Sequence, residues 1–308
     1  MKETAIDVNG LTKSFDGRTV VRDLSLKVPK GEIYGFLGPN GSGKTTTLRM
    51  LCGLLTPDSG DGTCLGYDIR TEADAIKRNV GYMTQRFSLY GDLSIRENLE
   101  FVARVYGVPD PKGAASRAIA RLGLGSRQDQ LAGELSGGWK QRLALGACIL
   151  PEPRLLLLDE PTAGVDPKAR REFWDEIHGL AAEGITVLVS THYMDEAERC
   201  HELAYIAFGE LLAQGTAKEV VAQSGLNTWI VSGGDLRRLG PRLQAREGID
   251  MVAPFGAELH VSGRDQAALD AAIKAAEKQD GAHRWTRGAP SLEDVFILLM
   301  TKAKDNFA

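Results

Sequence analysis

Apolar and polar side chains alternate through the first thirty residues of the chain, a pattern typical of strands that bury one face. The alternation fills two stretches within residues 5–28, and Asp16-Gly17 between them is a favourable pair for a tight turn. We therefore expect a small antiparallel β-layer at the start of the chain.

Further along, short buried strands are predicted at 32–37, 80–84, 155–158 and 185–190. Two of these runs are largely apolar, which suits a parallel sheet covered on both faces. The first run leads into a glycine loop, and helical spacing follows at 45–55. This strand, loop and helix unit places the core in the α/β class.

The segment between the second and third of these strands has a helical pattern. It begins with Ser94-x-x-Glu97, a capping box ahead of an apolar face. Helix breakers at 107–113 divide the segment, and another helix is predicted to begin near Gly137. We expect a helical subdomain at about 87–150.

After Gly225 the predicted elements become shorter and weaker, and their order is βαββαβ, the ferredoxin-like pattern. The predicted elements are strand 228–231, helix 236–245, strands 249–252 and 258–261, helix 266–279 and strand 283–286. A capped helix from Ser291 closes the chain. We therefore predict a first domain over 4–222 and a C-terminal α+β domain over 227–308.

Composition limits the kinds of partner. The net charge is −4 and the basic residues are scattered, so we expect no nucleic-acid partner. The four cysteines show no paired spacing, and neither a signal-like stretch nor a membrane-length apolar run is present. These features predict a cytoplasmic protein whose membrane role, if it has one, depends on a partner chain.

Glycine is unusually frequent, with 35 among 308 residues, and one glycine cluster has clear chemistry. Residues 38–45 fit GxxxxGK[ST] between a predicted strand and a helix, the context that a phosphate-binding loop requires. Backbone N–H groups of such a loop and the helix N-terminus bind phosphate oxygens. Lys44 is expected to reach the β- and γ-phosphates, and the Thr45 hydroxyl to coordinate Mg²⁺. The predicted nucleotide-binding residues here are Gly38, Pro39, Asn40, Gly41, Ser42, Gly43, Lys44, Thr45 and Thr46.

Four polar residues follow predicted strands, at the edge where parallel α/β sheets bind ligands. They are Gln85, Asp159, Glu160 and His192. Asp159 is expected to hold the metal directly or through water, and Glu160 to orient and activate an attacking water. We expect all four to converge on the phosphate loop.

A second anion site is predicted where Leu135-Ser-Gly-Gly138 precedes a long helix. One chain rarely needs two phosphate clamps. Taken with LLLLDEP at 155–161 and AGVDP at 163–167, the motifs resemble, in order and spacing, the ATP-binding subunit of an ABC transporter.

That resemblance implies a P-loop ABC ATPase core, with ATP and Mg²⁺ as cofactors, in which two subunits sandwich two ATP molecules. Ser136, Gly137 and Gly138 of one chain would contact the γ-phosphate held by the other. Asp166 would be the interface acid that links the two sites.

The resemblance also assigns roles within one chain. Gln85 would sense Mg²⁺ and the attacking water, His192 would contact the γ-phosphate, and Phe15 would stack on adenine. Packing on the β-layer is the alternative for Phe15, and a satisfied histidine at a helix start is the alternative for His192. Trp139 departs from the commonest family pattern, which puts the packing of the dimer seam in question.

Two segments point to a membrane partner. Residues 290–296, PSLEDVF, look like the tail of ATPases that drive ABC type 2 exporters, although the bare pattern is also a helix cap. After Gln85, residues 86–90 place apolar and aromatic side chains on a loop. We expect them to receive a short helix of the permease, with packing against the core as the alternative.

The leading hypothesis is an ATP-hydrolysing subunit that dimerises on ATP and drives separate integral membrane permease chains of an exporter. The resemblance would place it on the inner face of the cell membrane. The alternatives are a soluble ABC ATPase acting on ribosomes or in DNA repair, and a module that binds ATP without hydrolysis. A single cassette without basic arms argues against the first, and the complete set of motifs against the second.

Overall fold

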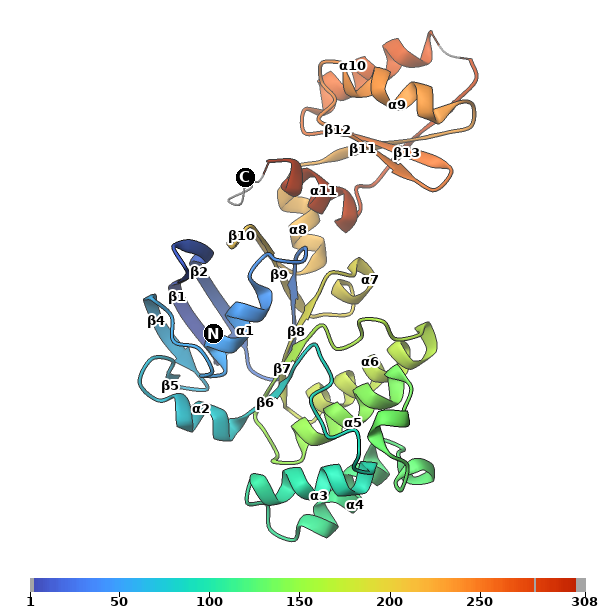
Figure 1. The fold of residues 1–308 in the computed structure, drawn as a ribbon. Helices are drawn as coiled ribbons and strands as arrows, with labels where there is room; N and C mark the ends of the chain where they lie inside the picture. Colours follow the sequence, from blue (N-terminus) through green and yellow to red (C-terminus); the bar gives the residue numbers. More distant parts are fainter. Residues whose placement is uncertain (1–2, 280, 303–308) are drawn as a thin grey trace. The chain divides into compact units, whose positions relative to one another are not determined.

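The computed structural model describes residues 3–279 and 281–302. The chain divides into two compact units, one ending at Leu211 and the other beginning at Leu212 (Figure 1). This division precedes the predicted boundary at 222–227, because helix α8 (Ala217–Ser224) contacts α11 (Leu292–Lys302) and groups with the second unit. Residues 280 and 303–308 of the predicted second domain lie outside the described residues.

The N-terminal β-layer is confirmed as an antiparallel sheet. Its strands are β1 (Thr4–Phe15), β2 (Arg18–Pro29), β4 (Ser59–Cys64) and β5 (Tyr67–Asp68), in the order β2-β1-β4-β5. We did not predict β4, whose sequence SGDGTC reads as a turn. Its glycines allow close pairing with β1: a Cβ at Gly60 would lie 2.5 Å from the backbone of Gly10, and one at Gly62 would lie 2.3 Å from the carbonyl oxygen of Asp7.

The core sheet has six strands in the order β10-β9-β3-β8-β7-β6. Its pairs β3-β8, β8-β7 and β7-β6 are parallel, as predicted, and β9, which was not predicted, pairs parallel with β3. The strands are β3 (Ile33–Leu37), β6 (Val80–Met83), β7 (Leu155–Asp159), β8 (Thr186–Thr191), β9 (Glu202–Ala207) and β10 (Glu210–Gly215).

Both faces of this sheet are covered, which explains the run of four leucines in β7. Leu155 and Leu157 belong to a core shared with the antiparallel layer and helix α1 (Lys44–Leu51). Leu156 and Leu158 belong to the opposite core, which contains the helices on the other face. A strand buried on both faces has no polar alternation, because every side chain meets a hydrophobic layer.

The helical subdomain is built largely as the sequence indicates. Its helices are α3 (Ile95–Val105), α4 (Pro111–Arg121) and α5 (Gly137–Ile149). The predicted capping box is confirmed: Ser94 N donates to Glu97 Oε2 at 2.8 Å, and Glu97 N donates to Ser94 Oγ at 3.2 Å. The break between α3 and α4 is shorter than predicted, because α4 begins at Pro111 and includes Gly113. The unit also contains α2 (Ala73–Asn79), α6 (Pro167–Ala182) and α7 (Met194–Ala197).

The second unit has the predicted βαββαβ order. After α8 it contains β11 (Asn227–Ser232), α9 (Leu236–Gln244), β12 (Met251–Phe255), β13 (Glu258–Gly263), α10 (Gln266–Glu277), β14 (Arg284–Gly288) and α11. The sheet order is β12-β13-β11-β14, with every pair antiparallel. In the tail motif, Asp294 N donates to Ser291 Oγ at 3.1 Å, so this segment caps α11.

Over residues 3–279 and 281–302, no helix is both long enough and apolar enough to cross a membrane.

Candidate nucleotide-binding site

The phosphate loop joins β3 to α1, as predicted. Gly43 adopts φ = 101°, and a Cβ there would lie 2.7 Å from the carbonyl oxygen of Val20, so the turn requires glycine. Gly43 is also the N-cap residue of α1, and no side chain caps this helix end. The first N–H groups of α1 therefore remain free to bind an anion.

Lys44 is buried at the centre of the site. Its Nζ donates to the carbonyl oxygens of Gly38 at 2.8 Å and Pro39 at 3.0 Å, and lies 3.2 Å from Glu160 Oε1. Burial lowers the pKa of Lys44, while the carboxylates of Glu160 and Asp159 act in the opposite direction. The loop thus holds an ammonium group inside the turn that closes around phosphate.

Glu160 brings together residues from three strand ends. Its Oε2 accepts a hydrogen bond from Gln85 Nε2 at 3.0 Å and lies 3.5 Å from His192 Nδ1. The residue has φ = 47° and is 8% exposed. Lys44, Gln85 and His192 therefore all approach one carboxylate, although they are far apart in the sequence.

Asp159 lies behind this group, 1% exposed. Ser190 Oγ donates to Asp159 Oδ1 at 2.8 Å and accepts from Glu160 N at 3.0 Å, so one hydroxyl holds both acidic residues. Tyr82 OH donates to Asp159 Oδ2 at 3.5 Å, and burial raises the pKa of Tyr82 to about 12. We did not predict Ser190 or Tyr82. Ser190 is a polar position in an apolar strand, and that was the only signal.

A cavity of about 370 Å³ lies over the loop. It is lined by Val20, Asn40, Gly41, Gly43, Lys44, Thr45, Thr46, Gln85 and Glu160. Eight of these nine residues were predicted from the sequence as site residues, and the ninth, Val20, was not, because an apolar strand position carries no ligand signal. Ser42 Oγ is buried and has no hydrogen-bond partner among the described residues, as expected of a hydroxyl that meets a ligand.

The donors available for a metal are oxygen atoms. Thr45 and Gln85 line the cavity, and the Asp159 carboxylate lies behind it, a set that suits Mg²⁺. Within the described part of the chain, no group of three or more His, Cys, Asp or Glu residues forms a metal cluster. The chain's own ligands therefore fit an ion that keeps waters and binds phosphate as well.

The residues of the second predicted anion site are not at this cavity. Ser136 is exposed and makes no capping bond at the start of α5, and Gly137 is exposed beside it. A Cβ at Gly138 would lie 2.6 Å from Cβ of Ala169, so this glycine permits close packing against α6. Asp166 caps α6, accepting from the backbone N–H groups of Lys168 at 3.1 Å and Ala169 at 3.0 Å.

The structure shows the surroundings of two aromatic residues singled out in the sequence, Phe15 and Trp139. Phe15 is 45% exposed, and its ring centroid lies 5.7 Å from Nζ of Lys13. Its side chain is therefore not buried in the β-layer. Trp139 is partly buried against the helical core, with the guanidinium carbons of Arg127 and Arg142 at 5.1 and 5.4 Å from its ring. The tryptophan is held by cation–π contacts within its own chain.

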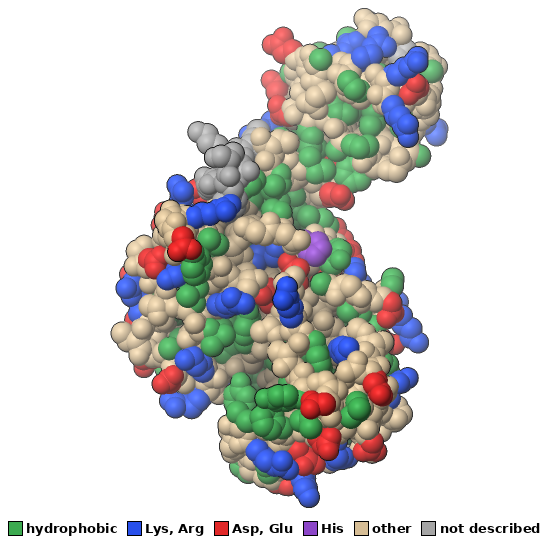
Figure 2. Space-filling view, viewed as in Figure 1, with side chains coloured by type: hydrophobic (Ala, Val, Ile, Leu, Met, Phe, Trp, Pro, Cys, Tyr) green, Lys and Arg blue, Asp and Glu red, His purple; other side chains and the backbone are tan. Residues whose placement is uncertain are grey.

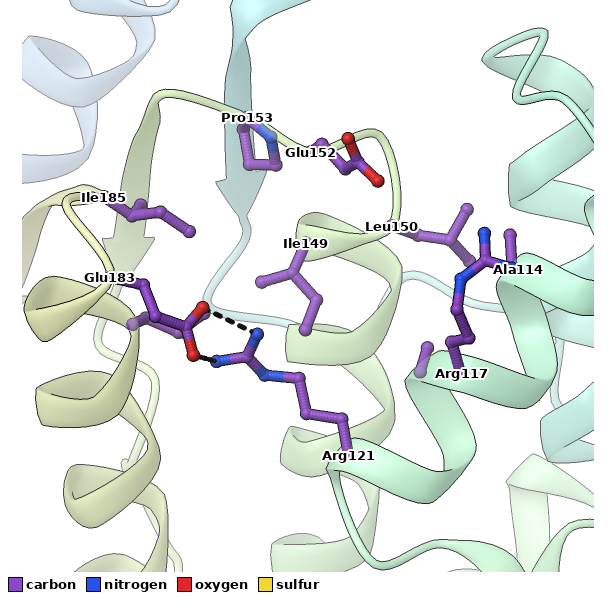
Figure 3. Close-up of a pocket in the computed structure, with 11 residues that line it drawn as sticks. Ala114, Arg117, Arg121, Ile149, Leu150, Glu152, Pro153, Glu183 and Ile185 are labelled. Atoms are coloured by element: carbon purple, nitrogen blue, oxygen red, sulfur yellow. Dashed lines mark hydrogen bonds and ion pairs between the residues drawn. The ribbon is translucent and has the colours of Figure 1, made fainter.

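A separate cavity of about 520 Å³ lies among the helices (Figure 3). Its floor is apolar, and at its side the Arg121 guanidinium donates to both carboxylate oxygens of Glu183 at 2.9 Å (Figure 3). Arg121 Nε also donates to Glu176 at 2.8 Å, so this arginine ties the end of α4 to α6. The cavity contains none of the phosphate-loop residues.

The fold and the site define a class of protein. It is a P-loop nucleotide-binding protein in which a lysine, a glutamine and a histidine meet one glutamate at the edge of a parallel sheet. Comparison with known proteins narrows that class. Residues 21–163 match the family model described as ABC transporter. The chain belongs to the ABC transporter family and has the fold of its ATP-binding cassettes, which hydrolyse ATP.

Two of the similar proteins are named as ATP-binding proteins of transport systems. The probable multidrug ABC transporter ATP-binding protein YbhF of Escherichia coli (strain K12) is 45% identical over 227 residues, 72% of this chain and 39% of that relative. The Nod factor export ATP-binding protein I of Burkholderia pseudomallei (strain 1710b) is 37% identical over 309 residues, 97% of this chain and 98% of that relative. The solved structure of cbiO1 from Clostridium perfringens, part of the ABC transporter complex cbiONQ, has a TM-score of 0.66 at 26% identity, covering 80% of this chain and 96% of that one.

Proposed function

We propose that this chain is the ATP-hydrolysing subunit of an exporter, that it works as a dimer, and that it drives separate membrane permease chains from the inner face of the membrane. The observation that carries this proposal is the convergence of Lys44, Gln85 and His192 on the Glu160 carboxylate. The names of the two relatives, multidrug transport and Nod factor export, support the export direction.

In the proposed reaction, the loop N–H groups and Lys44 bind the β- and γ-phosphates. Glu160 accepts a proton from the attacking water, Gln85 and His192 orient that water and the γ-phosphate, and Phe15 stacks on adenine. Thr45, Gln85 and Asp159 would hold Mg²⁺, which supplies charge stabilisation for the transferred phosphoryl group when bound. The test of the catalytic assignment is the Glu160→Gln variant argued in the Discussion.

The site within one chain is incomplete, which supports the dimer. The exposed Ser136 hydroxyl and the α5 N-terminus form a second anion-binding device that does not line the loop cavity. In a two-fold dimer, this device of one chain faces the phosphate loop of the other. Asp166 caps the N-terminus of α6 beside it and would lie at the same seam.

Mixing two inactive variants tests the shared site. Lys44→Ala and Ser136→Arg chains should each be inactive, whereas a heterodimer combines one intact composite site with one doubly broken site. In a random mixture about a quarter of the composite sites are intact. We expect the steady-state ATP turnover of the mixture to rise in proportion to the fraction of heterodimer. That fraction is measured by capturing the mixture successively through two affinity tags, one on each variant. No recovery in confirmed heterodimers would show that both sites are required or that sites are not shared.

Tyr90, five residues after Gln85 in the sequence, is part of an exposed apolar surface, which supports a permease contact. Tyr90, Phe101, Val105 and Tyr106 are 54%, 39%, 66% and 52% exposed, and Figure 2 shows hydrophobic side chains gathered over α3. We call these four residues the docking surface. The rings of Tyr90 and Phe101 meet edge to face, with centroids 5.2 Å apart. Exposed aromatic clusters of this kind suit the apolar face of a partner's helix.

The loop after Gln85 is divided between the two roles predicted for it. Phe87 and Leu89 pack partly buried against the helical core, as in the packing alternative, whereas Tyr90 is exposed. A groove next to them is lined by residues 86–89 and by Val102, Tyr106 and Gln141. Tyr90 is therefore the better probe of docking, since a change at Leu89 also disturbs the core.

Removing exposed apolar groups should uncouple the permease. We expect Tyr90→Ala to weaken capture of the permease at least about tenfold, as loss of an anchoring aromatic does. Val105→Ser should weaken capture in the same direction, because it removes exposed apolar surface, and ATP turnover of the isolated subunit should stay within about twofold in both variants. Leu54→Ser, at a leucine 56% exposed elsewhere in the unit, is the matched control. If permease capture is unchanged and the melting temperature falls, the surface serves packing instead.

A further inference from the structure

Glu196 is a buried carboxylate to which neither the sequence motifs nor the proposed reaction assigns a role. It lies in α7, four residues after His192, and is 0% exposed. A charged group in such a place is costly unless hydrogen bonds and counter-charges satisfy it. Its partners therefore show what the position is for.

The two oxygens of Glu196 hold two different loops. Oε1 accepts a hydrogen bond from the hydroxyl of Thr162, two residues after Glu160, and Oε2 accepts from Thr191 Oγ1 at 2.6 Å, one residue before His192. Both threonines are 1% exposed. One side chain thus spans the segments that carry the two groups lying 3.5 Å apart in the site.

Thr191 extends this link toward the phosphate loop. Its Oγ1 also accepts from Tyr193 N at 3.0 Å, and its carbonyl oxygen accepts from Gly38 N at 3.3 Å. The ring of Tyr193 lies 4.1 Å from that of His192, centroid to centroid. Rotation or displacement of Thr191 would therefore move the histidine relative to the phosphate loop.

Arg170 of α6 supplies the counter-charge. Its Nε lies 3.6 Å from Glu196 Oε1, its Nη1 lies 3.8 Å from Asp195 Oδ2, and its guanidinium carbon lies 4.4 Å from the centroid of the Tyr193 ring. The carboxylate is therefore held from three elements: the loop after β7, the end of β8, and α6. Such a group fixes the distance between these elements.

We propose that Glu196 is a positioning residue, which holds Glu160 and His192 at the separation needed to align the attacking water with the γ-phosphate. The proposal rests on the catalytic roles proposed for those two residues. Because the phosphate loop supplies most of the ATP contacts, Glu196 should affect turnover rather than binding.

The test compares Glu196→Ala with Glu196→Gln in the full chain. We expect Glu196→Ala to lower kcat about tenfold or more, as small misplacements of catalytic groups do, with KM for ATP within about threefold. Glu196→Gln should restore most of the activity, since its amide can accept from one threonine and donate to the other. Glu198→Ala, at an exposed residue on the same turn, is the control and should match the wild type.

Two further measurements keep the test decisive. If Glu196→Ala does not fold, Thr162→Val and Thr191→Val remove one hydroxyl each at similar volume and should show the same loss of kcat. An unchanged kcat, or a loss that appears only with equal losses of ATP affinity and melting temperature, overturns the proposal. Glu160→Gln separates the two claims: if it is inactive while Glu196→Ala is fully active, only the positioning role fails.

Discussion

Replacing Glu160 by glutamine should reduce ATP turnover by at least ~100-fold, the lower range for loss of a general base. The amide keeps the volume of the carboxylate and can still contact Lys44 and Gln85, which now lie 3.2 and 3.0 Å from the carboxylate oxygens. ATP affinity should therefore persist, and the ATP-bound dimer should accumulate. The measurements are steady-state phosphate release, calorimetric titration with ATP, and mass by light scattering.

The chain offers a close control for this substitution. Glu152 also has a positive φ, 55°, but its side chain is exposed and outside the site. Glu152→Gln should leave turnover unchanged, which separates the loss of the base from an effect of the backbone conformation. Turnover near the wild-type rate in Glu160→Gln would remove Glu160 from the mechanism.

Replacing Lys44 by alanine should act on binding. A charge-assisted hydrogen bond contributes about 1.5–3 kcal/mol, so losing it weakens ATP affinity about ten- to a hundredfold, with turnover lost as well. The variant also leaves the Glu160 carboxylate without its ammonium partner at 3.2 Å. Calorimetric titration with ATP measures the effect.

A surface lysine provides the comparison. Lys27 lies on β2, with its side chain 67% exposed and Nζ 3.2 Å from Asp7, and Lys27→Ala should bind ATP like the wild type. Tight ATP binding by Lys44→Ala would contradict the role assigned to this residue.

The parts of the site that could be predicted from sequence are those whose chemistry is local. The glycine spacing of the phosphate loop and the acidic pair after the leucine run each indicate a ligand-binding strand end by themselves. Placing Gln85 and His192 at the same edge needed only the rule that parallel strands share a carboxyl edge. The structure brings both to Glu160.

The remaining parts depend on contacts between distant segments. Glu196 lies in a short helix, and nothing in its neighbourhood in the sequence indicates that its partners are 34 residues before it and five before it. Strand β4 was missed because its glycines indicate turns locally, whereas pairing with β1 makes them necessary. The exposure of Ser136 could likewise not be predicted, since an uncapped serine and a capping serine look alike in sequence.

The backbone of Glu160, with φ = 47°, has a consequence for any attempt to raise the thermal stability of this protein. A side chain in the left-handed region costs about 1–2 kcal/mol, a cost that glycine does not incur. Glycine at position 160 would relieve this cost, but it would also remove the carboxylate that pairs with the buried Lys44 ammonium at 3.2 Å, a loss of about 3–5 kcal/mol. The ion pair therefore outweighs the backbone strain, and a stabilisation programme has to leave residue 160 unchanged and look for its gains elsewhere.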